Sequence, residues 1–67
     1  MDRETLQEYL AAAEEHIEGA RRRVTKQAEI VAQLKAADQD ATVALNLLAH
    51  FESSLDNFMR DRDLVLR

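Results

Sequence analysis

The amino-acid sequence predicts an all-α protein, an antiparallel two-helix hairpin of the coiled-coil type that dimerises into a four-helix bundle. The first observation is a heptad repeat of apolar residues along the first half of the chain. The second is a jump in the phase of that repeat beside residues that begin helices. The third is composition, because the chain has no proline, a single glycine and many strong helix formers.

The first helix is predicted over about residues 3–36, with Asp2 as its N-cap. Within it, apolar or small residues recur at alternating spacings of 4 and 3, which keeps one stripe facing a partner helix. The stripe consists of Leu6, Leu10, Ala13, Ile17, Ala20, Val24, Gln27, Val31 and Leu34.

The pattern breaks between residues 36 and 42, where Asp38 or Asp40 can cap a new helix. We expect a turn at about residues 37–40, since short connections are usual between helices in small bundles. The alternative is one continuous helix with a stutter, about 100 Å long. In either case the 67 residues form a single domain.

The second helix is predicted over about residues 41–66, and it is the more apolar of the two. Leu45, Leu47 and Met59 flank its heptad stripe, and a stripe this wide indicates contact with more than one neighbour. The stripe itself consists of Ala41, Ala44, Leu48, Phe51, Leu55, Phe58, Arg62 and Val65.

A fold near residue 39 explains how the helices pair. It places Ala20 opposite Phe58 and Gln27 opposite Phe51, so that small residues of one helix meet large residues of the other. It also places Glu14 level with Arg62. The residues expected to form the core or an interface are Leu10, Ile17, Val24, Val31, Leu34, Leu45, Leu48, Phe51, Leu55, Phe58 and Met59.

A single hairpin leaves part of this apolar surface uncovered, and such surfaces mark interfaces. We expect an exposed strip formed by Tyr9, Ile30, Leu45, Leu47 and Met59. The simplest way to bury this strip is dimerisation with a second copy of the chain. The alternative is binding of a different protein that supplies one or two helices.

Composition excludes several classes of function. The net charge of −4 repels nucleic acid and anionic lipid, and no apolar run approaches the ~20 residues that span a bilayer. The chain has no cysteine, and its first residues form no secretory signal, so we expect a cytoplasmic protein without a disulfide or a cofactor.

His16 is the one candidate signalling residue. It lies at the rim of the stripe, close before Gly19, as does the histidine of phosphotransfer bundles; the alternative is a structural pair with Asp61. His50 is expected to be solvated. Neither histidine belongs to the Glu-x-x-His motif of di-iron bundles, so we predict no metal site.

Two other groups of polar residues give weaker indications. The arginines from Arg21 to Arg23 suggest a nucleic-acid accessory role, but they fan around the helix and acidic residues lie one turn away. Ser53 and Ser54 have no histidine–acid arrangement near them and no predicted pocket that could form an oxyanion hole, so we do not expect an enzyme.

Three stretches resemble a set of short, uncharacterised helical-hairpin proteins of alpha-proteobacteria. They are His16–Arg22, Leu47–Glu52 and Asp61–Leu64. The resemblance implies a hairpin and no particular function. Those proteins often carry a glycine in the turn, where this chain has Ala37, Asp38 and Gln39.

Taken together, the residues favour a small protein–protein interaction module, a scaffold, adaptor or regulator that self-associates through a helical face. Its expected anchors are Leu48, Phe51, Leu55 and Phe58. The alternatives are a phosphorelay-type bundle that uses His16 and a nucleic-acid accessory protein.

Overall fold

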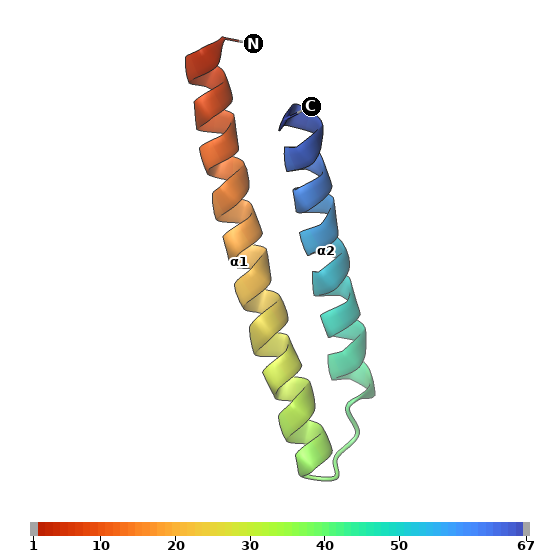
Figure 1. Ribbon diagram of the computed structural model, residues 1–67. Helices are drawn as coiled ribbons and strands as arrows, with labels where there is room; N and C mark the ends of the chain where they lie inside the picture. Colours follow the sequence, from red (N-terminus) through yellow and green to blue (C-terminus); the bar gives the residue numbers. More distant parts are fainter. Residues whose placement is uncertain (1, 67) are drawn as a thin grey trace.

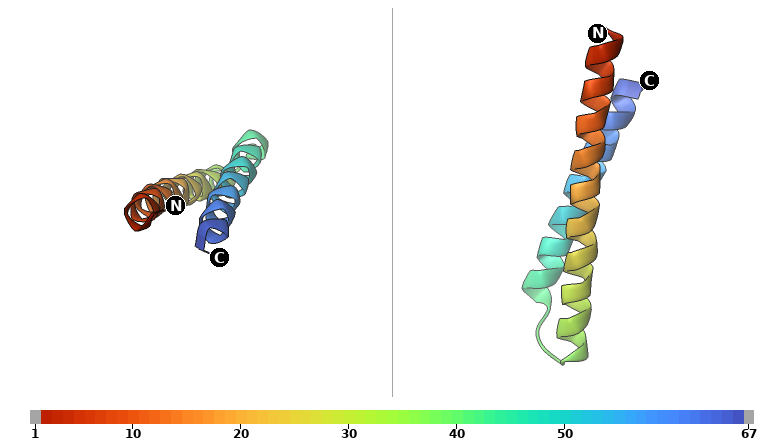
Figure 2. Two further views of the ribbon diagram at one scale, coloured as in Figure 1. Left: turned by 90° about the horizontal axis from the view of Figure 1, so that it is seen from above. Right: turned by 90° about the vertical axis from the view of Figure 1, so that its left-hand side faces the viewer.

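The computed structural model describes residues 2–66 and shows a hairpin of two helices, α1 (Arg3–Ala36) and α2 (Thr42–Leu66), packed antiparallel (Figure 1). Its principal extents are 54 × 14 × 13 Å, so the molecule is a narrow rod. The two helices run side by side and cross each other rather than lying with parallel axes (Figure 2). The predicted all-helical hairpin is therefore confirmed, and the chain does not form one continuous helix.

The first helix begins at the predicted cap. Asp2 has an extended backbone, and its Oδ1 accepts a hydrogen bond of 2.7 Å from the backbone N–H of Thr5. The same hydrogen bond lowers the pKa of the Asp2 carboxyl below its usual range. Asp2 thus satisfies one of the backbone donors that every helix leaves free at its start.

The end of α1 explains how the chain turns without glycine. The N–H of Asp38 donates to the carbonyl of Lys35 at 3.1 Å, and the N–H of Gln39 donates to the carbonyl of Leu34 at 2.9 Å. This hydrogen-bond pattern is the Schellman motif, which needs a left-handed residue just beyond the helix. Asp38 adopts that conformation, with φ of 57°.

The second helix begins with another aspartate. Oδ1 of Asp40 accepts hydrogen bonds from the backbone N–H of Thr42 at 2.9 Å and from its hydroxyl at 2.6 Å. The hydroxyl contributes most to the lowered pKa of Asp40. After the turn the connecting segment runs back along α1, and Ala41 in this segment is buried. The first turn of α2 therefore lies further from the loop end of the hairpin than the last turn of α1 does (Figure 1).

The core lies between the two heptad stripes. Every residue of both stripes is buried or half-buried, whereas most other side chains are exposed. The most deeply buried are Ile17 and Ala20 of α1, at 2% and 1% exposure. Gln27 is also buried, and its side-chain Nε2 donates to the carbonyl of Ala44 at 3.0 Å. By contrast, no described residue of α2 is fully buried.

The pairing of the helices differs from the prediction by about one helical turn. Phe58 lines one hollow with His16 and another with Ala20, so it lies across from Ile17, between them, rather than directly opposite Ala20. Likewise, Gln27 reaches Ala44 instead of pairing with Phe51. The cause is the extended end of the loop, which sets α2 further along α1 than a tight turn at residue 39 would.

Candidate functional site

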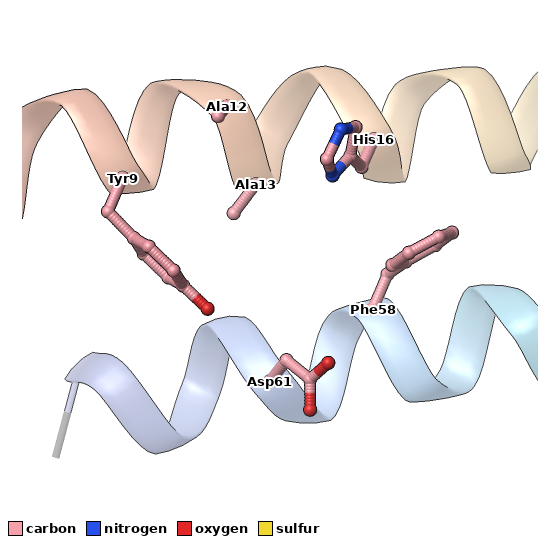
Figure 3. Close-up of a pocket in the computed structure, with 6 residues that line it drawn as sticks. All are labelled: Tyr9, Ala12, Ala13, His16, Phe58 and Asp61. Carbon is pink, nitrogen blue, oxygen red and sulfur yellow. The ribbon is translucent and has the colours of Figure 1, made fainter.

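A shallow hollow of about 200 Å³ lies near the open end of the hairpin (Figure 3). Tyr9, Ala13 and His16 line it from α1, and Phe58 and Asp61 line it from α2. The imidazole of His16 faces the ring of Phe58, with centroids 5.6 Å apart and planes tilted by 40°. Among the described residues His16 forms no ion pair with Asp61, so the predicted structural pair is absent.

A second hollow, of about 190 Å³, continues the first toward the loop. Arg23 of α1 faces His50, Phe51 and Ser54 of α2 there, and Phe58 separates it from the first hollow. His50 is exposed, and its ring centroid lies 6.4 Å from that of Phe51. The two hollows therefore form one discontinuous groove along a single side of the hairpin.

We name this side the His16 face. Heptad spacing extends it beyond the hollows, because residues seven apart lie on one side of a helix in a coiled coil. The face consists of Tyr9, His16, Arg23 and Ile30 of α1 and Leu47, His50, Ser54, Asp61 and Leu64 of α2.

The opposite side, which we name the Glu14 face, is strongly acidic. Nη1 of Arg62 contacts Oε1 of Glu14 at 3.3 Å, so these two side chains meet across the hairpin as predicted. Hydrogen bonds to Asp63 first, and then to Glu14, raise the pKa of Arg62 above its usual value. The Glu14 face consists of Glu14, Glu18 and Arg21 of α1 and Leu45, Glu52, Asp56, Met59, Asp63 and Leu66 of α2.

The exposed apolar residues are divided between the two faces. Tyr9, Ile30 and Leu47 are exposed on the His16 face, and Leu45 is exposed on the Glu14 face. Met59 lies seven residues from Glu52 on the Glu14 face and is half-buried. The five residues predicted to form one exposed strip thus lie on two sides, because the hairpin separates the two edges of the wide α2 stripe.

The other residues considered as candidates, the metal-ligating types and the arginine cluster, do not come together into a site. Among residues 2–66 no three histidine, cysteine or acidic side chains could hold a metal ion together. The arginine cluster is divided, since Arg23 lies on the His16 face, Arg21 lies on the Glu14 face, and Arg22 lies between them on the outside of α1. Arg22 also pairs with Glu18 at 3.6 Å.

Sequence reasoning singled out His16 and placed Asp61 across the hairpin from it, but it did not predict that Tyr9, Arg23 and His50 share this face. The seven-residue spacing of Tyr9, His16, Arg23 and Ile30 was the available signal.

Comparison of the chain with protein-family models, curated proteins and solved structures finds no match. Across residues 2–66, neither helix combines the length and the apolar character that crossing a membrane requires.

Proposed function

We propose that this chain is a small protein–protein interaction module, a scaffold, adaptor or regulator that acts through a helical face as a homodimeric four-helix bundle. One observation carries the proposal: α2 is the more apolar helix, yet none of its described residues is fully buried in the single hairpin. Leu64 and Val43 remain 64% and 81% exposed. The absence of cysteine suits the reducing cytoplasm, where we place the protein.

The small number of elements supports this proposal. A stable domain buries the apolar side of each helix against other elements, and among residues 2–66 each helix has one other helix to pack against. Covering one exposed leucine contributes roughly 1.5–3 kcal/mol. A second layer that covers Leu47, Leu64 and the half-buried Phe51 and Phe58 therefore stabilises a chain that is otherwise too short for a large core.

Molar mass by light scattering, followed over a hundredfold dilution together with helicity by circular dichroism, tests this function. We expect the mass of a dimer with unchanged helicity over most of the range. A monomer that stays helical at every concentration would contradict self-association. A monomer that loses helicity on dilution and regains it with a helical partner protein would replace the second copy with that partner.

The exposure of His16 favours one alternative function. Its imidazole stands at the rim of the first hollow, with one side against Phe58. A phosphorelay bundle needs such a reachable histidine. Incubating the chain with a phosphorylated receiver domain tests this alternative, and a His16→Gln variant serves as the control. Phosphate transfer to the unaltered chain alone would establish it, whereas equal signals from both would exclude it.

A further inference from the structure

We infer that the second copy of the chain docks on the His16 face, with the two loops at opposite ends of the four-helix bundle. The inference rests on the proposed self-association and specifies its surface and its orientation. Three features of the described residues support it: the difference in charge between the faces, the positions of the charges along the His16 face, and the placement of exposed apolar residues at both ends.

The difference in charge selects the face. In a two-fold dimer the same surface of each copy meets itself, so a surface of one sign repels its own copy. The Glu14 face carries five carboxylates, on Glu14, Glu18, Glu52, Asp56 and Asp63, against two guanidiniums, that of Arg21 and that of Arg62, which pairs with Glu14 and Asp63. The His16 face carries one carboxylate, on Asp61, and one guanidinium, on Arg23. It is therefore the face that can meet itself without repulsion.

The positions of these charges select the orientation. His16 lies level with Phe58, and Ala13 lies level with Asp61 (Figure 3). Arg23 consequently lies about 15 Å nearer the loop than Asp61, at a rise of 1.5 Å per residue. With both loops at one end, the arginines of the two copies would share a layer. With the loops at opposite ends, each Arg23 layer meets an Asp61 layer, and opposite charges attract.

The apolar residues fit the same orientation. Ile30 and Leu47 are exposed near the loop, whereas Tyr9 and Leu64 are exposed near the open end. The two-fold axis passes midway between the levels of Arg23 and Asp61. Leu47 lies about 13 Å from this axis on one side and Leu64 about 12 Å on the other. The rotation therefore brings α2 against α2 of the second copy, with Leu47 beside Leu64.

Single-cysteine variants test this arrangement directly, because the chain has no cysteine of its own. One sample carries Leu47→Cys, a second carries Leu64→Cys, and a third is their equimolar mixture after subunit exchange. Each sample is treated with a short bismaleimide and analysed on a denaturing gel. We expect cross-linked dimer in the mixture and little in either single sample, since like positions in the two copies lie about 25 Å apart along the axis.

A matched pair on the Glu14 face serves as the control. Leu45 and Leu66 are also exposed, and the pair has the same midpoint along α2 as Leu47 and Leu64. We expect no cross-link when Leu45→Cys and Leu66→Cys are mixed. A cross-link from this pair alone would place the interface on the Glu14 face. A cross-link in the sample that contains only the Leu47→Cys variant would mean that both loops lie at the same end of the bundle. Either result would overturn the inference while leaving a dimer.

A monomer in light scattering with no cross-link from any pair would overturn both the inference and the proposed self-association.

Charge reversal provides a second measurement that needs no cross-linker. An Asp61→Arg variant should weaken dimerisation about tenfold at low ionic strength, because the new arginine meets Arg23 of the other copy. Adding Arg23→Glu to the same chain should restore the affinity. The matched control is Asp56→Arg on the Glu14 face, which makes the same change in net charge and should leave the affinity within about threefold. Equal effects of Asp61→Arg and Asp56→Arg would contradict the proposed contact.

Discussion

The two helices of the hairpin use the same heptad spacing and reach different degrees of burial. In α1, four residues are fully buried although the helix is the more polar of the two. In α2, none is fully buried although the helix is rich in leucine and phenylalanine. Small residues such as Ala20 are covered completely by one neighbouring helix, whereas Phe58 is wide enough to need a second. The hairpin therefore completes the packing of α1 and leaves that of α2 for another layer.

Of the substitutions that follow, truncation of Phe58 should have the largest effect on the free energy of unfolding. Although the side chain is only half-buried in the hairpin, it packs against His16 and lines both hollows. We expect Phe58→Ala to lower the free energy of unfolding by about 3–5 kcal/mol, as measured by urea denaturation of the dimer. The control Phe58→Leu should cost less than about 1.5 kcal/mol. A loss below about 1 kcal/mol for the alanine variant would mean that Phe58 remains at the surface.

Gln27 is the polar exception in the buried stripe of α1. Its amide donates to the carbonyl of Ala44, and one polar group in such a stripe fixes the register at a cost in stability. We expect Gln27→Leu to raise the free energy of unfolding by about 1 kcal/mol and to broaden the distribution of oligomeric states. Thermal unfolding and light scattering measure the two effects. A loss of stability with an unchanged molar mass would mean that the hydrogen bond outweighs apolar packing.

The loop sets the level at which α2 meets α1, and Asp38 is its strained residue. A left-handed backbone is unfavourable for most residues and is free of that penalty for glycine. Asp38→Gly should therefore raise the free energy of unfolding by about 1 kcal/mol, measured by urea denaturation. Asp38→Val should lower it, because a β-branched side chain tolerates this conformation poorly. Equal stability of all three proteins would contradict the left-handed turn.

The smallest expected effect concerns the caps of the two helices. The pKa values of Asp2 and Asp40 are lower in the folded chain than in the unfolded one, so both carboxylates stabilise the fold above about pH 4. That contribution disappears as the pH falls through the folded values. We expect unfolding temperatures to decline below about pH 4 and the decline to be weaker in Asp2→Asn and Asp40→Asn variants. Identical acid profiles of the variants and the unaltered chain would exclude this role.

Heptad spacing and the phase jump beside the capping aspartates were sufficient to predict the hairpin and both stripes. The contact between Glu14 and Arg62 was also predicted, because both side chains are long enough to meet despite a small shift between the helices. The displacement of the helices by about one turn was not predictable in this way. It depends on the left-handed Asp38 and the extended residues after it, and nothing in the heptads specifies either. The α1 part of the His16 face follows from seven-residue spacing, but which α2 residues line its hollows depends on the level at which the two helices meet.

Small-angle X-ray scattering of the purified chain, at a concentration where light scattering gives its mass, tests the central claim most directly. A single hairpin is 54 Å long, and a second hairpin packed beside it adds width and almost no length. We predict the mass of a dimer with a maximum dimension of about 60–65 Å, once side chains are added at both ends. A dimer of about 100 Å would mean helices joined end to end or a straightened chain, and it would contradict the proposed four-helix bundle.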